Sequence, residues 1–189
     1  SILANGELSR ISVDKLLYEF DDFEQTLINS NQIKGEISSV FKASFFINPT
    51  KSFDLKSLTF NSDNSFQHVK LVDYNYVAEL VDYFDESMIT RNIVDIPYYK
   101  QKSKKIIFKP FKNNMSFKNG KLNISPTYLE NNMLNLNLKG TQTISDSVDY
   151  YMSFNWKEIK KRNKKEKEDY LEEKEEIKEL FLRITGHLD

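Results

Sequence analysis

The 189-residue sequence contains no cysteine. This absence excludes disulfides, thiolate metal sites and cysteine nucleophiles. Histidine is also scarce, and with only His68 and His187 neither an HExxH site nor a three-histidine zinc site can form within the chain. The five glycines are too scattered for a phosphate-binding glycine loop. Several common enzyme classes are therefore excluded.

An excess of one charge and a long apolar run are missing as well. Lys plus Arg number 27 and Asp plus Glu number 28, so the formal charge is −1 and gives no electrostatic basis for binding nucleic acid. No apolar run approaches the ~20 residues of a membrane helix, and no signal peptide is visible. Hydrophobic residues make up 39% of the chain, which is enough to bury a core. We expect a single domain over residues 1–189.

Alternating apolar and polar residues are the dominant local pattern, and they predict β-strands. The longest run covers residues 33–47 and ends at Asn48-Pro49. Asn119-Gly120 predicts a two-residue hairpin turn, whose return strand we expect to stop at Pro126. The other predicted strands cover residues 53–60, 66–72, 106–117, 134–139, 148–156 and 180–188.

Two segments have the spacing of amphipathic helices. The first follows a predicted N-cap at Ser12 and covers residues 13–23, with Leu27 and Ile28 extending it, and the second covers residues 76–84. Residues 86–105 are expected to form a long connection broken by Pro97. In residues 157–179, 18 of 23 side chains are charged, which predicts a charged helical or flexible insertion between two strands.

Together these patterns predict a mainly β (α+β) fold, with a long curved antiparallel sheet and two amphipathic helices packed on its apolar face. Two interpretations of that face stay open: a closed core beneath the helices, or a lining exposed to lipid. The side chains predicted to line it are Leu134, Leu136, Leu138, Val148, Tyr150, Met152, Phe154, Trp156, Leu182 and Ile184.

From residue 106 onward the order of these motifs resembles the C-terminal region of AsmA-like proteins. The hairpin at 117–124 is similar to that family's "ikNGxlxi" motif, and residues 134–141 to the "xLxLxGT" strand that follows it. Residues 145–150 resemble its "sfDxxiDY" turn and strand, and residues 182–189 its "lxitGtldxPk" ending. Upstream, residues 15–23 and 33–35 resemble the preceding helix and long strand. The resemblance thus covers nearly the whole chain.

The resemblance implies a non-enzymatic protein of the periplasm, attached to the inner membrane through a segment absent from this chain. It implies a function in outer-membrane biogenesis and in phospholipid transport between the two membranes. Phospholipid acyl chains and envelope proteins are the implied partners, without a cofactor, a metal or nucleic acid. This chain would form one segment of a long hydrophobic β-groove.

A different class of protein remains an alternative. A β-rich envelope module, of the adhesin or sugar-binding type, would share the alternating strands but would place exposed aromatic side chains in a polar cleft. An enzyme would need polar groups that converge on a pocket, and the carboxylates of Asp21, Asp22, Asp82, Asp85 and Glu86 are expected to be helix-surface charges instead. We expect both histidines to be surface residues.

Overall fold

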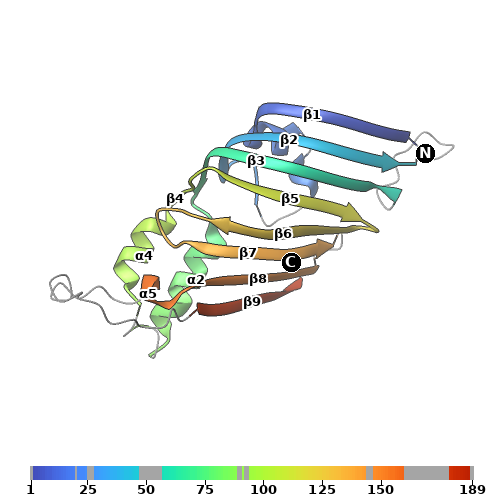
Figure 1. The fold of residues 1–189 in the computed structure, drawn as a ribbon. Helices are drawn as coiled ribbons and strands as arrows, with labels where there is room; N and C mark the ends of the chain where they lie inside the picture. Colours follow the sequence, from blue (N-terminus) through green and yellow to red (C-terminus); the bar gives the residue numbers. More distant parts are fainter. Residues whose placement is uncertain are drawn as a thin grey trace, which may run out of the picture.

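A computed structural model gives the fold of residues 2–19, 21–24, 28–46, 57–88, 91, 94–143, 147–159 and 179–187. In this part of the chain, strands predominate and short helices connect or follow them (Figure 1).

The described residues form nine strands in one open sheet. The strands are β1 (Ile2–Ser12), β2 (Ile33–Phe45), β3 (Thr59–Val72), β4 (Lys105–Ile107), β5 (Phe111–Lys118), β6 (Lys121–Leu129), β7 (Leu136–Thr143), β8 (Ser147–Asn155) and β9 (Glu179–His187). Their order is β1-β2-β3-β5-β6-β7-β8-β9, with β4 paired to β3, and every pair is antiparallel. The predicted mainly β fold with a long antiparallel sheet is confirmed.

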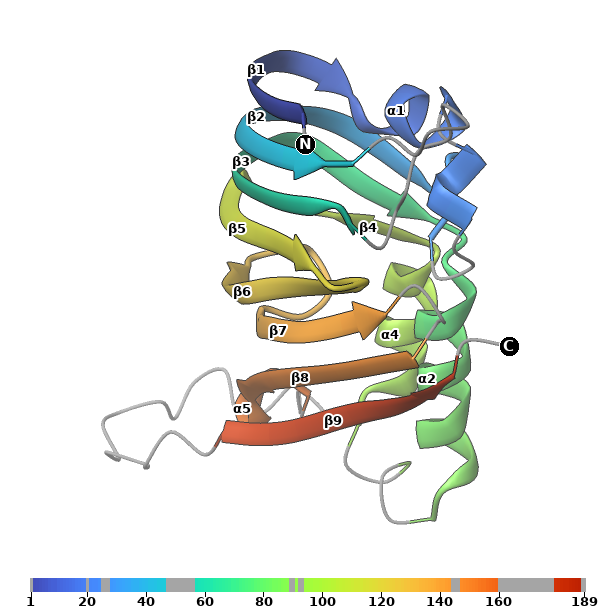
Figure 2. The same ribbon diagram turned by 90° about the vertical axis from the view of Figure 1, so that its right-hand side faces the viewer.

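Helices cover one face of this sheet. They are α1 (Val13–Glu19), the 3₁₀ turn η1 (Asp21–Glu24), α2 (Asn75–Glu86), α4 (Ile96–Ser103) and α5 (Trp156–Ile159). Figure 2 shows α1, α2 and α4 on the same side of the sheet, and β1, β2 and β3 bent with their concave side toward these helices. We call this side the inner face and the opposite side the outer face. The two predicted helices are confirmed as α1, which is shorter than expected, and α2.

Two clusters of buried side chains join the helices to the inner face. The first lies between α2, α4 and the end of the sheet at β8 and β9, and consists of Val81, Val94, Ile96 and Tyr99, with Leu134, Phe154 and Leu180 packed against it. The second lies between α1 and strands β2, β3 and β5, and consists of Val13, Phe66 and Val69, with Ile37 and Phe111 packed against it. The helices therefore contribute their apolar side chains to clusters that also contain side chains of the sheet.

Irregular backbone recurs at neighbouring points of the first three strands. Arg10 in β1 and His68 in β3 have φ values of 52° and 55°, and Gly35 in β2 has a φ of 145°. The pairing register shifts at these points: between Leu8 and Ile11 in β1, and between Lys34 and Glu36 in β2. Such β-bulges bend a strand and increase its twist, which suits the bent shape of this part of the sheet.

Two expectations about the first half of the chain were wrong. Strand β1 was not predicted, although it pairs along most of its length with β2. Residues 66–72 do not form a strand of their own, because β3 runs without interruption from Thr59 to Val72. Its polar middle is accommodated by hydrogen bonds between buried side chains, described below. The predicted start of a strand at 53–56 lies outside the described residues.

Two expectations that relied on proline as a chain breaker were also wrong, and the third, the strand end at Asn48-Pro49, lies outside the described residues. Pro97 begins a helix instead of interrupting a loop: it lies in the first turn of α4, where its missing N–H costs no hydrogen bond, and the Asp95 side chain caps that turn. Pro126 does not end the return strand, because β6 continues to Leu129. The register shift between Ile124 and Thr127 removes Pro126 from the regular ladder.

Other expectations fall partly outside the described residues. Residues 160–178 of the charged block lie outside them, whereas residues 157–159 belong to α5. The turn at Ser145-Asp146 and the side chain of Trp156 lie outside as well. His68 is exposed, as expected, and the side chain of His187 is not described.

Candidate functional site

The register of the sheet places most of the predicted apolar lining on the inner face. Leu136 is opposite Phe154, Leu138 is opposite Met152, and Leu182 of β9 is opposite Met152 on its other side. Tyr150 is flanked by Gly140 and Ile184 in the next row. Directly opposite residues of an antiparallel pair share a face of the sheet, so these side chains form consecutive rows.

Part of this lining is covered by helices. Leu134 precedes β7 and packs, with Phe154, against the core cluster beneath α2 and α4. Val148 and Tyr150 are buried, at 6% and 8% exposure, whereas Ile184 near the edge of the sheet is 42% exposed. Burial raises the pKa of Tyr74, just before α2, and Tyr76 and Tyr150 add to that rise. At β7–β9 the inner face is therefore largely a core.

A second apolar region crosses the inner face at β2–β6. Cross-strand pairing aligns Ala43 with Phe60, Phe60 with Phe117, and Phe117 with Leu122. Phe41 lies one row away, with its ring centroid 5.9 Å from that of Phe60. We call Phe41, Phe60, Phe117 and Leu122 the apolar strip. All four are half-buried, and within the described part of the chain they belong to neither core cluster.

Glycine makes room for one ring of this strip. A Cβ added at Gly6 of β1 would lie 2.4 Å from the ring of Phe41, which therefore extends across the neighbouring strand. The same relationship recurs on β7, where a Cβ at Gly140 would lie 2.4 Å from the ring of Tyr150. A small residue opposite a large ring lets the ring lie flat along the sheet. At these two positions the rings of Phe41 and Tyr150 therefore lie over a glycine of the neighbouring strand.

A row of polar side chains borders the apolar strip. Ser39, Asn64 and Asn113 are opposite one another on β2, β3 and β5, and all three are buried. The amide of Asn64 donates to Asn113 Oδ1 at 3.1 Å and to Ser62 Oγ at 3.0 Å. This row separates the strip from the stacked rings of Phe66 and Phe111 beneath α1, whose centroids are 4.7 Å apart. Hydrogen bonding within the row offsets the cost of burying its polar groups.

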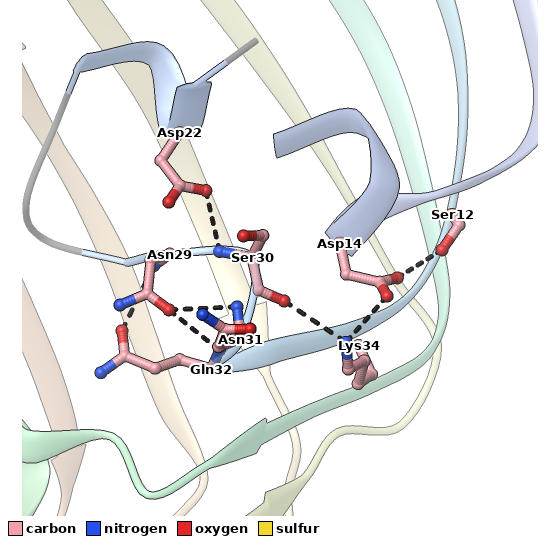
Figure 3. A network of polar contacts seen from close by, with 8 residues as sticks. All are labelled: Ser12, Asp14, Asp22, Asn29, Ser30, Asn31, Gln32 and Lys34. Carbon is pink, nitrogen blue, oxygen red and sulfur yellow. Dashed lines mark hydrogen bonds and ion pairs between the residues drawn. The ribbon is translucent and has the colours of Figure 1, made fainter. Parts of the chain in front are cut away.

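Hydrogen bonds also fix α1 against the start of β2 (Figure 3). Lys34 Nζ lies 2.8 Å from Asp14 Oδ2 and donates to the Ser30 carbonyl at 3.4 Å. The Ser12 hydroxyl donates to the same Asp14 carboxylate. Partial burial acts to raise the pKa of Asp14, but the hydrogen bonds from Lys34 and Ser12 outweigh it and hold the pKa below its ordinary value.

The turn before β2 is closed by its own side chains. Asn29 Oδ1 accepts from the backbone N–H groups of Asn31 and Gln32, at 3.0 and 3.2 Å, and Asp22 accepts from the Ser30 N–H at 2.8 Å (Figure 3). These contacts fix the turn that leads into the first residues of β2. They use Asp22 in local structure rather than in a site.

Asp82 and Asp85, two of the other carboxylates singled out in the sequence, have structural partners as well. Lys100 of α4 lies 3.1 Å from Asp82 and 2.8 Å from Asp85, both on α2. These exposed pairs join the two helices. Among the described residues, no group of three or more His, Asp or Glu side chains is arranged to hold a metal ion.

Two shallow hollows lie over the outer face. They have volumes of about 410 and 390 Å³ and share Val40, Asp63 and Asn114 in their walls. Most of the side chains around them are polar, so neither hollow offers an apolar binding site.

The structure thus brings together eight of the ten predicted lining residues on the inner face, but it distributes them between core and rim. The apolar strip of β2–β6 was not singled out from the sequence. Its signal was present in the alternation of residues 33–45 and in the Asn119-Gly120 hairpin, but only the pairing register shows that these side chains adjoin one another.

Comparison with known proteins adds no assignment. No protein-family model matches the chain, and neither the curated proteins nor the solved structures include a significant match. No helix among the described residues is long and apolar enough to cross a membrane.

Proposed function

We propose that this chain is a non-enzymatic segment of an AsmA-like periplasmic protein, in which the inner face of the sheet shields phospholipid acyl chains from water. The protein would be attached to the inner membrane through a segment absent from this chain. It would act in outer-membrane biogenesis and in phospholipid transport between the membranes. No cofactor is required, because moving a lipid forms and breaks no covalent bond.

The observation that supports this proposal is the apolar strip on an open, bent sheet. Phe41, Phe60, Phe117 and Leu122 are contributed by four neighbouring strands, and the strip runs across the strands rather than along one of them. A methylene group moved from water into such surroundings gains about 0.8 kcal/mol. An acyl chain of ordinary length therefore gains on the order of 10 kcal/mol when it is fully covered.

The surroundings of the strip suit a lipid rather than a small polar ligand. On one side it adjoins the polar row of Ser39, Asn64 and Asn113, and toward the edge of the sheet it continues through Ala43 of β2 to Ala4 of the edge strand β1. An acyl chain could lie across several strands, while its polar end stays near water. A metal site or an acid–base catalytic site would instead require several charged side chains on this face. The apolar strip and the neighbouring polar row contain no charged side chain.

Photo-crosslinking tests which face meets lipid. A benzophenone amino acid replaces Phe117 in the strip or, as the control, Val40 of β2, which is 55% exposed on the outer face. After irradiation with a monomeric lysophospholipid, mass spectrometry should find the lipid adduct at position 117 and not at position 40. Equal labelling at both positions, or labelling at neither, would contradict the proposal.

Binding affinity gives a second test. Replacing both Phe60 and Phe117 with serine should weaken binding of a fluorescent fatty acid at least tenfold, because each ring contributes on the order of 1.5–3 kcal/mol of apolar contact. Val40→Ser on the outer face should leave the affinity unchanged. Circular dichroism of each variant confirms that the sheet is retained.

A further inference from the structure

The outer face of β5, β6 and β7 carries charge of a single sign. These three strands contain four lysines, Lys112, Lys118, Lys121 and Lys139, and no acidic residue. All four lysines are exposed, and the register places them on the face opposite the apolar strip. The whole chain has a charge of −1, so this concentration is a local feature. We call these four residues the lysine face.

The lysines are only weakly compensated by their neighbours. Within the described part of the chain, none of the four forms an ion pair with a carboxylate. Of the acidic groups on the flanking strands, Asp63 accepts a hydrogen bond from Asn114, and Asp149 holds Arg183 through contacts of 2.8 and 3.1 Å. Hydrogen bonding from Arg183 is the main cause of the lowered pKa of Asp149, and the charge of Lys121 makes a smaller contribution to it. The lysine face therefore carries net positive charge.

One pair of these lysines costs the fold stability. Lys118 and Lys121 are directly opposite one another across the Asn119-Gly120 hairpin. Like charges at opposite positions of an antiparallel pair repel, whereas an opposite charge at either position would be favourable. An anionic partner bound to this face would relieve the repulsion between these two lysines.

Exposed aromatic rings adjoin the lysines on the same face. Tyr128 of β6 is 57% exposed, and Tyr151 and Phe181 of β8 and β9 are 39% and 79% exposed. Lys139 Nζ lies 5.6 Å from the ring centroid of Tyr151, and the Arg183 guanidinium lies 5.0 Å from it on the other neighbouring strand. The two tyrosine rings have a polar end, whereas Phe181 is apolar throughout. Aromatic rings set among cations suit the headgroup region of a membrane, where apolar and charged groups meet.

We propose that the outer face of β5–β9 docks on the surface of a bilayer that contains anionic phospholipid. The lysines meet the phosphate-rich surface, and the three rings enter the headgroup layer. The face is formed by adjacent strands in the middle and at one edge of the sheet, and none of the helices α1, α2 and α4 lies over it (Figures 1 and 2). This proposal does not depend on lipid in the apolar strip, because it concerns the opposite face.

Vesicle cosedimentation tests the docking. The protein should sediment with vesicles of phosphatidylcholine and phosphatidylglycerol at 7:3, not with pure phosphatidylcholine, and binding should weaken as salt is added. Lys118→Gln with Lys121→Gln should lower partitioning about 25-fold, since each basic residue near an anionic surface is worth about fivefold. The matched control, Lys15→Gln with Lys104→Gln, removes the same charge from exposed positions on α1 and after α4 and should leave partitioning unchanged.

Other outcomes overturn the proposal. Equal sedimentation with neutral and anionic vesicles would show that the lysines do not carry the interaction. An equal loss in the two double variants would show that net charge, rather than this face, is responsible. Binding to heparin without binding to vesicles would assign the face to a soluble polyanion. Thermal unfolding should show that both double variants fold: the control should match the parent, and Lys118→Gln with Lys121→Gln should be at least as stable, because it removes the repulsion between the two lysines.

Discussion

Val69 of β3 lies directly against Gly35 of β2: a Cβ added to Gly35 would be 2.8 Å from the Cα of Val69 and 2.9 Å from its Cγ2. The contact joins a bulge, where Gly35 has a φ of 145°, to the core cluster beneath α1. Backbone atoms on the far side of the contact leave little room for adjustment. The bent half of the sheet therefore depends on a position without a side chain.

Gly35→Ala should lower the free energy of unfolding by about 1–3 kcal/mol, because the new methyl group meets backbone and the φ value disfavours a side chain. Urea denaturation measures the change. Gly186→Ala is the matched control, since Gly186 has a similar φ of 159° but nothing within 4 Å of an added Cβ. Equal losses in the two variants would show that the contact with Val69 is unimportant.

The cluster beneath α2 and α4 should be sensitive to the loss of a methyl group. Val81 is 2% exposed, so Val81→Ala should destabilise the fold by roughly 1–3 kcal/mol through lost contacts and a new cavity. Val40→Ala makes the same chemical change at a position that is 55% exposed and should have little effect. If thermal unfolding shows that Val40→Ala loses as much stability as Val81→Ala or more, the packing described here is contradicted.

The contact between Asp14 and Lys34 should make part of the stability depend on pH. The folded-state pKa of Asp14 lies below its ordinary value of 3.8, so its contribution is complete well above that value and is lost as the pH falls through the lowered pKa. Asp14→Asn should therefore lower stability at pH 7, by less than about 1 kcal/mol because the pair is partly exposed. The difference between the two proteins should shrink as the pH falls below about 4.

The control for this series is Asp73→Asn. Asp73 is exposed, and its φ of 48° is one that asparagine also accepts. Urea midpoints measured from neutral to acidic pH should be the same for this variant and the parent. If the difference in stability between Asp14→Asn and the parent is also the same at every pH, the Asp14 carboxylate does not hold α1 in place.

Tyr150 should contribute through its hydroxyl as well as its ring. The hydroxyl donates to Gln142 Oε1 at 3.0 Å, and burial raises the pKa of Tyr150. Tyr150→Phe should cost about 0.5–1.5 kcal/mol, the net value of one such hydrogen bond. Tyr128→Phe, at an exposed ring on the outer face, should be neutral in the same denaturation assay. Equal effects would show that the Gln142 contact adds nothing.

The parts of the fold that could be predicted are those in which local pattern and tertiary environment agree. Alternation over residues 33–45 and the Asn119-Gly120 dipeptide each specify a local structure, and the sheet buries the face that the alternation indicates. Helix α2 was predicted on the same basis, since its apolar residues recur at helical spacing and pack against the sheet.

The parts that could not be predicted depend on contacts distant in the chain. Strand β1 contains Asn5-Gly6, which reads locally as a turn, but in the fold Gly6 is a strand residue that accommodates the ring of Phe41. The polar middle of β3 reads as a break, but Asn64 is satisfied by Asn113, 49 residues later. The apolar strip depends on the register of four strands, which no single segment determines.

The order of the strands has a consequence for how the chain is made. Along the sheet, each strand pairs with the strand that precedes it in the chain, except that β4 and β5 both add to β3. Sequential pairing of this kind lets the sheet assemble in the order in which the chain is made. A ribosome could therefore release this protein one hairpin at a time, with every newly emerged strand meeting a finished template and none waiting for the far end of the chain.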